Sequence, residues 1–379
     1  MKRIACLLLL IAVTFLLLPA GTVQALTGEA GILINKLVEK GILTKAEGRQ
    51  LLKEMQSEAE KLKSTAEQTK SGTTKKSDPK EAKTATVDIP KWVQKIKFKG
   101  DFRFRYETLE LEDTADRARW RIRWRLGATA KVTNNWTTGF GLASGDEGPR
   151  STNQSLHNSF ETPDVRLDYA YVQYDPWKFL STVGGKFRNP IWMPKDLIWD
   201  SDIRTDGIAA TFIHKTSSAT FFVMPAWFTL AEFKGDESDP YMWVLQSGIK
   251  SELPFHMYVQ GAAAYYDYQN VTGNSFKWSS RSNSIDEDEN LTQNYDAWNL
   301  DAEFGIKLDN SYVPMVAVFG QYVDSKANSE DVGYLAGFKF GHKKVKNLAQ
   351  WQVKYNYRIL ERDAVPDFLP DADFLFGRT

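Results

Sequence analysis

The chain has 379 residues, with 48 Lys and Arg balanced by 48 Asp and Glu. This balance argues against a nucleic-acid-binding protein, which carries a net basic domain. Beyond the N-terminus no apolar run approaches the ~18 residues of a transmembrane helix. Aromatic residues make up 13% of the chain and glycines number 25, which together favour β-strands with one polar face.

The first 25 residues have the pattern of a secretory signal peptide. Lys2 and Arg3 form a charged start, residues 7–18 are apolar, and residues 23–25 (Val-Gln-Ala) place small side chains at a cleavage site. Cleavage removes Cys6, the one cysteine, and thereby excludes disulfides and cysteine sites from the mature chain. The protein is expected to leave the cytoplasm.

Residues 26–63 show helical periodicity. Thr44 and Glu47 have the spacing of a capping box, and an apolar stripe follows them. The pattern predicts a small helical hairpin, or a coiled-coil-like segment that associates between subunits. Residues 64–90 are rich in Lys, Ser, Thr and Ala and are predicted to form a flexible linker.

From residue 91 to residue 379 the apolar period is mostly two. Strands of ten to sixteen residues exceed the ~5–6 residues usual in soluble sheets and match the ~9–11 residues that a tilted transmembrane strand needs. We therefore predict an all-β fold, a transmembrane antiparallel up-and-down β-barrel. The thirteen predicted strands are 96–107, 117–132, 136–144, 164–174, 178–188, 206–214, 219–230, 241–251, 256–268, 297–308, 312–323, 332–341 and 348–360.

The connections alternate in length. Turns after even-numbered strands are short, whereas loops such as 145–163, 189–205 and 269–296 are long. Short turns on one rim and long loops on the other are typical of outer-membrane barrels, and this polarity would put the 26–63 segment in the periplasm. Because single-chain bacterial barrels have even strand counts, we expect the barrel to be C-terminally incomplete, with 14 or more strands in the complete protein.

A row of basic residues follows one face of the first two strands. The opposite face carries Trp120, Ile122 and Trp124, and a charge facing lipid at the midplane costs ~2–4 kcal/mol per Arg, so the row is predicted to face the pore. It is either a salt-bridge network with Asp101 and Glu107 that stiffens the wall or a stripe that attracts anions. The predicted pore-lining residues are Lys97, Lys99, Arg103, Arg105, Arg117, Arg119, Arg121, Arg123, Arg125, Asp301 and Glu303.

Three central arginines are expected to carry most of an anion preference. Arg119, Arg121 and Arg123 follow each other at ~6–7 Å along the strand, within a Debye length of ~8 Å at physiological salt, so their fields overlap. Asp301 and Glu303 come much later in the chain and are expected to face the row across the lumen instead of pairing within the wall. Such an arrangement would bias the pore toward anions without excluding cations.

Other chemistry has weaker support. The sequence has no catalytic, metal or cofactor motif, so we predict no catalytic residue, no metal and no cofactor; a barrel hydrolase would have to use His214 or His256. The acidic run 286–289 is expected to be a solvated loop, or else a cation-binding or pore-folded one. Asp200 and Asp202 either cap the backbone of their loop or line the pore mouth.

Five segments carry a family likeness: NKLVEKGILTKAE (35–47), RLGATAKVTNNWTTGFGLASG (125–145), GGKFRNPIW (184–192), LIWDSD (197–202) and PDFLPDADF (366–374). In them the chain resembles the putative outer-membrane porin family of Gram-negative bacteria and, more loosely, the phosphate-selective porins. The likeness implies an oligomeric pore, with a homotrimer as one candidate, that passes small hydrophilic solutes.

We therefore predict a non-enzymatic outer-membrane porin for passive diffusion of small hydrophilic solutes, with an anion bias. One alternative is a substrate-selective anion channel of the phosphate type. Another is a structural anchor that contacts the cell wall through the N-terminal segment. The predicted partners are solutes, anions and outer-membrane lipid, and not nucleic acid.

Overall fold

The computed structural model describes residues 49, 53, 95–110, 116–156, 159–235 and 238–371. The chain divides into two units, Met1–Thr86 and Val87–Thr379. The predicted signal peptide, helical segment and linker lie outside the described residues, apart from the helical Arg49 and Lys53. No helix within the described ranges is long and apolar enough to cross a bilayer.

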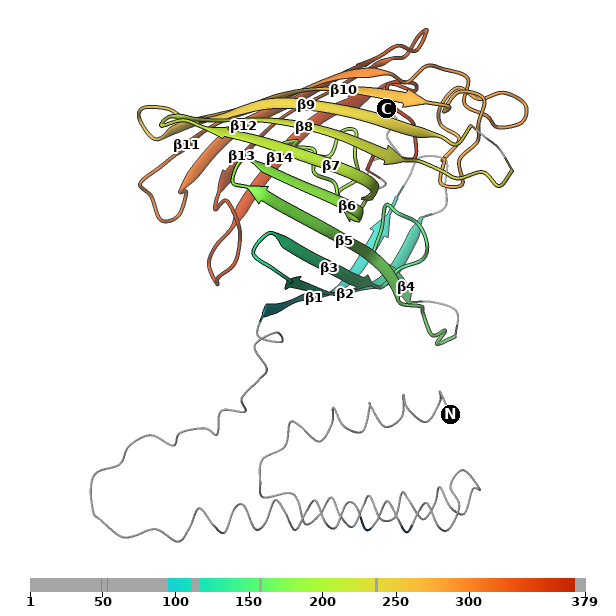
Figure 1. Ribbon diagram of the computed structural model, residues 1–379, viewed down its shortest axis with the longest axis horizontal. Coiled ribbons are helices and arrows are strands. Elements are labelled where there is room, and N and C mark those ends of the chain that lie inside the picture. The colour runs from blue at the N-terminus through green and yellow to red at the C-terminus, as the bar shows by residue number, and fades with distance from the viewer. Residues whose placement is uncertain are drawn as a thin grey trace. The chain divides into compact units, whose positions relative to one another are not determined.

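The described part of the second unit is one curved antiparallel sheet of fourteen strands (Figure 1). Strands pair in sequence order, except that the short β4 pairs with β2, beyond the part of β2 that pairs with β3. All thirteen predicted strands are present, which confirms the all-β up-and-down fold class; β4 was not predicted. The strands are β1 Ile96–Leu109, β2 Arg117–Lys131, β3 Trp136–Ala143, β4 Gln154–Leu156, β5 Arg166–Trp177, β6 Leu180–Arg188, β7 Arg204–Lys215, β8 Ala219–Thr229, β9 Tyr241–Glu252, β10 Met257–Gln269, β11 Ala297–Lys307, β12 Met315–Ser325, β13 Val332–Gly341 and β14 Gln352–Leu360.

The outer face of the sheet exposes large apolar side chains, the reverse of a soluble protein. On β11 the side chains of Trp298 and Leu300 are exposed, whereas Asn299 and Asp301, which alternate with them, are buried. The phenylalanines of β1 are likewise exposed, Phe102 by 68%. An apolar outer face is what a strand in lipid requires.

The connections follow the predicted polarity. Short turns such as 132–135, 178–179 and 216–218 join strands on one rim, and long connections such as 144–165 and 270–296 lie on the other. In the described sheet, β1 pairs with β2 and β14 pairs with β13.

Three segments from the long-loop rim fold onto the inner face of the sheet and build a hydrophobic core there. They are residues 189–203 after β6, residues 271–295 after β10, and residues 361–371 after β14. Much of the inner space beside the later strands is therefore filled with side chains and not with water. The largest apolar side chains buried in this core are Tyr266, Tyr295, Phe228, Leu197, Met224, Met242, Leu291 and Leu335.

Candidate functional site: a basic wall and an inward segment

The inner face of β1 and β2 forms a basic wall, which we define as Arg103, Arg105, Arg119, Arg121, Arg123 and Arg125. The β1–β2 register sets Arg103 opposite Arg123 and Arg105 opposite Arg121. Like charges directly across an antiparallel pair are destabilising. The wall therefore depends on counter-charges from elsewhere.

Glu107 supplies one counter-charge at the long-loop end of the wall. Its carboxylate accepts hydrogen bonds from Arg105 Nη2 at 2.9 Å, Arg119 Nη2 at 3.2 Å and Arg121 Nη1 at 3.1 Å. All four side chains are largely withdrawn from solvent. Charge-assisted bonds of this kind are the strong class of hydrogen bond, so Glu107 holds three guanidinium groups in fixed positions.

Asp101 supplies a second counter-charge at the other end. Arg123 Nη2 and Arg125 Nε each lie 2.8 Å from its carboxylate oxygens. Asp202 contributes a third from outside the two strands, at 3.5 Å from Arg125 Nη1. Five of the six guanidinium groups thus share three carboxylates, and Arg103 bonds Asn153 instead, which leaves a positive excess on the wall.

Residues 151–153 cover part of the wall. Arg121 Nη2 donates to the Asn153 carbonyl at 3.2 Å and lies 3.4 Å from Ser151 Oγ, and Arg103 donates to the Asn153 side-chain oxygen. Arg121 is only 9% exposed as a result. This cover belongs to the long connection that contains β4.

Residues 189–203 form what we call the inward segment. Its first anchor is Gln246 on β9, whose side-chain amide accepts from Trp192 N and donates to Trp192 O, both at 2.8 Å. Gln246 is fully buried. A side-chain amide that pairs with both the N–H and the C=O of one residue fixes the segment against β9, because each backbone group would otherwise lose its hydrogen-bond partner.

Further anchors hold the segment across the interior. Leu197 N donates to Gln321 Oε1 on β12 at 3.3 Å, and Asp196 pairs with Arg358 on β14 at 3.4 Å. Residues near the end of the segment reach the basic wall through Asp202. The segment therefore contacts both the later strands and the first two.

The two aspartates of this segment have different partners. Asp200 Oδ1 accepts the backbone N–H of Asp202 at 2.7 Å, so Asp200 caps its own loop. Asp202 faces Arg125 and also lies 3.4 Å from Thr152 Oγ1.

The remaining predicted pore-lining residues have varied surroundings. Lys97, Lys99 and Arg117 are exposed. Asp301 is only 3% exposed; it accepts from Gln321 Nε2 at 2.8 Å beneath the inward segment, so it is not open to solvent. Glu303 pairs with Lys339 at 2.6 Å and accepts from Tyr258 at 2.8 Å. Both carboxylates thus bond neighbours in their own wall, which differs from the expectation that they would face the arginines unpaired.

The anchors of the inward segment were not found from sequence. Gln246 follows Met242 and Val244 at inner-face positions of β9. A polar side chain in that apolar row is the feature of the sequence that could have indicated an anchor. A buried ion pair between Arg204 on β7 and Asp168 on β5, at 3.2 Å, was also missed. Nothing in the sequence links these residues, since their partners lie far away along the chain.

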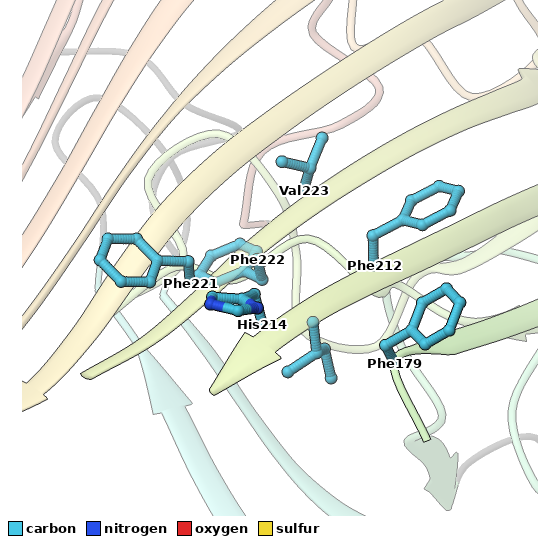
Figure 2. A pocket seen from close by; sticks show the side chains of 7 residues that line it. Phe179, Phe212, His214, Phe221, Phe222 and Val223 are labelled. Carbon is cyan, nitrogen blue, oxygen red and sulfur yellow. The ribbon is translucent and has the colours of Figure 1, made fainter. Parts of the chain in front are cut away.

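An apolar groove lies on the sheet near the short turns of β6, β7 and β8, and His214 is among its lining residues (Figure 2). Its lining includes Phe179, Phe212 and Phe221, which are exposed aromatics like those of the outer face.

Asp286 stabilises a turn in the predicted acidic loop 286–289. Its carboxylate accepts the backbone N–H groups of Asp288 and Asn290 at 3.0 and 2.8 Å.

An antiparallel up-and-down sheet with an apolar outer face, a charged inner wall and a connection folded across the interior defines an outer-membrane channel of the porin class. The model of the family described as "Putative porin" matches residues 109–297 and 287–379, more than half of the chain. The chain therefore belongs to this porin family. No curated protein matches it.

Several solved outer-membrane proteins are similar to the chain at low identity. Pseudomonas putida OprB is 11% identical with a TM-score of 0.44, covering 71% of this chain and 75% of that one. Salmonella typhi OmpF, solved with daunomycin, is 10% identical with a TM-score of 0.40, covering 73% and 93%. Vibrio cholerae OmpT, in a trimer form, is 11% identical with a TM-score of 0.39, covering 69% and 89%.

Proposed function

We propose that this porin lets small hydrophilic solutes diffuse passively across the outer membrane and that it prefers anions. The observation that carries the proposal is the charge imbalance on the basic wall, where Asp101, Glu107 and Asp202 offset only part of the six guanidinium charges. Arginine stays charged at any physiological pH. The excess positive charge is therefore permanent.

Several arginines of the wall also remain partly open to solvent, unlike the inner face of the later strands. Inner-face residues of the later strands, such as Met224, Met242 and Val323, are buried by the core. Arg105, Arg119 and Arg125 keep 21–29% of their side-chain surface exposed. A solute that passes between the basic wall and the inward segment meets these guanidinium groups at close range, and a narrow passage focuses their field.

The ion pairs limit the strength of the preference. Each carboxylate lies within 3.5 Å of at least one guanidinium group, so the positive field of the wall is weakened at these points. We therefore expect a bias toward anions and not an exclusion of cations. The sequence offered a salt-bridge network that stiffens the wall as the alternative to an anion-attracting stripe. We expect both roles together, since the same ion pairs hold the arginines in place.

The test is the reversal potential in a KCl gradient across a planar bilayer. We expect the reversal potential of the wild type to lie toward the chloride equilibrium potential. The reversal potential of the triple variant Arg119→Gln, Arg121→Gln, Arg123→Gln should lie closer to zero. A matched control removes three lysines at the short-turn ends of strands, Lys131, Lys215 and Lys250, which are exposed. Cation preference in the wild type, or equal shifts in both triple variants, would contradict the proposal.

The proposal includes a homotrimer and leaves the cell-wall contact of residues 26–63 as a separate prediction. The form of Vibrio cholerae OmpT among the similar structures is a trimer. Cross-linking after extraction in mild detergent would give the subunit number of this chain. Deletion of residues 26–63 with unchanged cell-wall association would remove the anchor prediction.

A further inference from the structure

The short turns of the sheet carry an excess of positive charge. They contain eight lysines and three carboxylates. Two of these carboxylates already have partners, because Glu252 pairs with Lys307 at 2.6 Å and Asp175 accepts from Gln173 Nε2 at 2.9 Å. This edge therefore attracts negative charge. We define it as the short-turn rim, residues 131–136, 175–180, 215–219, 250–257, 307–315 and 341–352.

Exposed aromatic rings lie at the short-turn rim and mark the level of the lipid headgroups. Trp136 stacks on Tyr174 with ring centroids 4.4 Å apart, and Trp177 stacks on Phe179 at 5.4 Å. All four side chains are exposed. Rings of this kind form the girdle of a transmembrane barrel at the membrane interface, so the lysines of the rim lie at headgroup level.

The apolar groove of Figure 2 extends from this level toward the middle of the membrane. Backbone pairing sets His214 opposite Phe221, and two residues deeper it sets Phe212 opposite Val223. The side chains of Phe212, Phe221 and Val223 are all exposed on the outer face. The groove therefore has an imidazole at its rim end and only apolar side chains at the deeper row.

Lys178 adds a positive charge at the rim end of the groove. Ile213 N donates to Phe179 O at 2.8 Å, so Lys178, one residue before Phe179, lies at the level of His214, one residue after Ile213. Within the part of the chain that the structure describes, Lys178 is exposed and forms no ion pair. An ammonium group and an imidazole N–H are both donors to phosphate oxygens.

We propose that this groove binds one anionic glycerophospholipid, such as phosphatidylglycerol, from the periplasmic leaflet, which the short turns of an outer-membrane barrel face. An acyl chain lies along the row of Phe212 and Val223, and the phosphate accepts from Lys178 and His214. The inference concerns the outer face of the sheet and does not depend on the anion preference of the pore.

The charge of the rim favours this occupant over the alternatives. A zwitterionic phospholipid has the same acyl chains but no net charge to offset the lysines. A second copy of the chain in the same membrane has the same orientation, so its own basic rim would meet this one at the same level, and like charges repel. An anionic lipid satisfies both the apolar groove and its cationic end.

The experiment is native mass spectrometry of the full chain in neutral detergent, titrated with phosphatidylglycerol or with phosphatidylcholine of the same acyl chains. We expect wild type to bind one phosphatidylglycerol more tightly than phosphatidylcholine. Lys178→Gln should weaken phosphatidylglycerol binding about fivefold, the factor equivalent to about 1 kcal/mol for one lysine at an anionic lipid surface, and leave phosphatidylcholine binding unchanged. Val223→Trp fills the groove and should weaken the binding of both lipids.

Each variant has a matched control. Lys346→Gln removes one lysine of the same rim in the turn between β13 and β14, far along the sheet from β7 and β8. Val318→Trp places the same bulk at an exposed valine on the outer face of β12. Neither control should change the binding of the first lipid, and heat modifiability on gels shows that all four variants fold.

Four results would overturn the inference. The first is equal binding of the two lipids by wild type, and the second is an equal loss in Lys178→Gln and Lys346→Gln, which would show a diffuse charge effect. The third is displacement of phosphatidylglycerol by excess inorganic phosphate, which would assign the cationic end to a soluble anion. The fourth is a changed subunit number in Val223→Trp with lipid binding intact, which would assign the groove to a second copy.

Discussion

Asp202 Oδ1 lies 3.5 Å from Nη1 of Arg125, although Asp202 belongs to the inward segment and Arg125 to β2. This ion pair links the segment to the basic wall and removes positive charge from the passage between them. In Asp202→Asn we expect a larger anion preference, because the partial counter-charge is gone, with a stability loss below ~1 kcal/mol for a partly exposed pair.

The measurement is the reversal potential together with urea unfolding. Glu252→Gln is the control, since Glu252 pairs with Lys307 at half-exposed positions near a short turn. A smaller anion preference in Asp202→Asn than in wild type would refute the assignment of this carboxylate to the passage.

Gln246 is expected to hold the inward segment in place. Gln246→Ala removes both hydrogen bonds to the Trp192 backbone and leaves its half-buried N–H and C=O without this partner, at up to about 1–3 kcal/mol each. We expect lower stability and a higher, noisier single-channel conductance. Ser247→Ala, on the exposed outer face of the same strand, should change neither quantity; identical effects of the two substitutions would count against the anchor.

Close packing on the inner face of β3 makes Gly141 sensitive to substitution. A Cβ at this position would lie 2.2 Å from Cε1 of the Tyr169 ring, so Gly141→Ala must displace the ring and is expected to cost about 1–3 kcal/mol. Gly261→Ala is the matched control, because its nearest atom would be the Asp301 carbonyl oxygen at 3.6 Å. Heat modifiability on gels checks both, and equal melting of the two variants would contradict this packing.

The lipid-facing assignment of β1 has a direct test. Phe102 is exposed on the outer face, so Phe102→Arg is expected to lower the unfolding free energy in lipid vesicles by ~2–4 kcal/mol. Phe102→Leu keeps the face apolar and should cost less than ~1.5 kcal/mol. Tolerance of arginine at this position would show that the face does not contact lipid.

Alkaline pH is expected to weaken the packing of the long loop after β10. Tyr295 donates to Asp363 at 3.1 Å, and burial, followed by the charge of Asp363, raises the pKa of the Tyr295 hydroxyl above its usual value. A raised folded-state pKa gives stability that is present below the unfolded value of ~10 and is lost as pH rises from there toward the folded value.

The unfolding free energy of wild type should therefore fall above pH ~10 by up to about 1.4 kcal/mol per pH unit from this group. Tyr295→Phe cannot ionise, so its decline over the same range should be shallower. Urea unfolding at a series of pH values measures the difference. Parallel declines in the two proteins would show that this hydroxyl does not contribute.

The local pattern of the sequence determined the strands and their faces. Residues 96–107 and 117–132 alternate strictly, and a strand turns successive side chains to opposite faces. Their polarity alone therefore indicated which face meets lipid and which carries arginines such as Arg121 and Arg123.

Only the tertiary structure decided which groups meet across the interior. Gln246 bonds Trp192, Arg125 pairs with Asp202, and Asp301 accepts from Gln321. The two residues of each pair lie on segments that are distant in sequence. Long connections carry no periodicity, so nothing in residues 189–203 indicated that they fold inward and bury apolar side chains. The charge of the passage depends on these distant pairings, because each carboxylate that reaches the wall cancels part of the field that the alternation of β1 and β2 created.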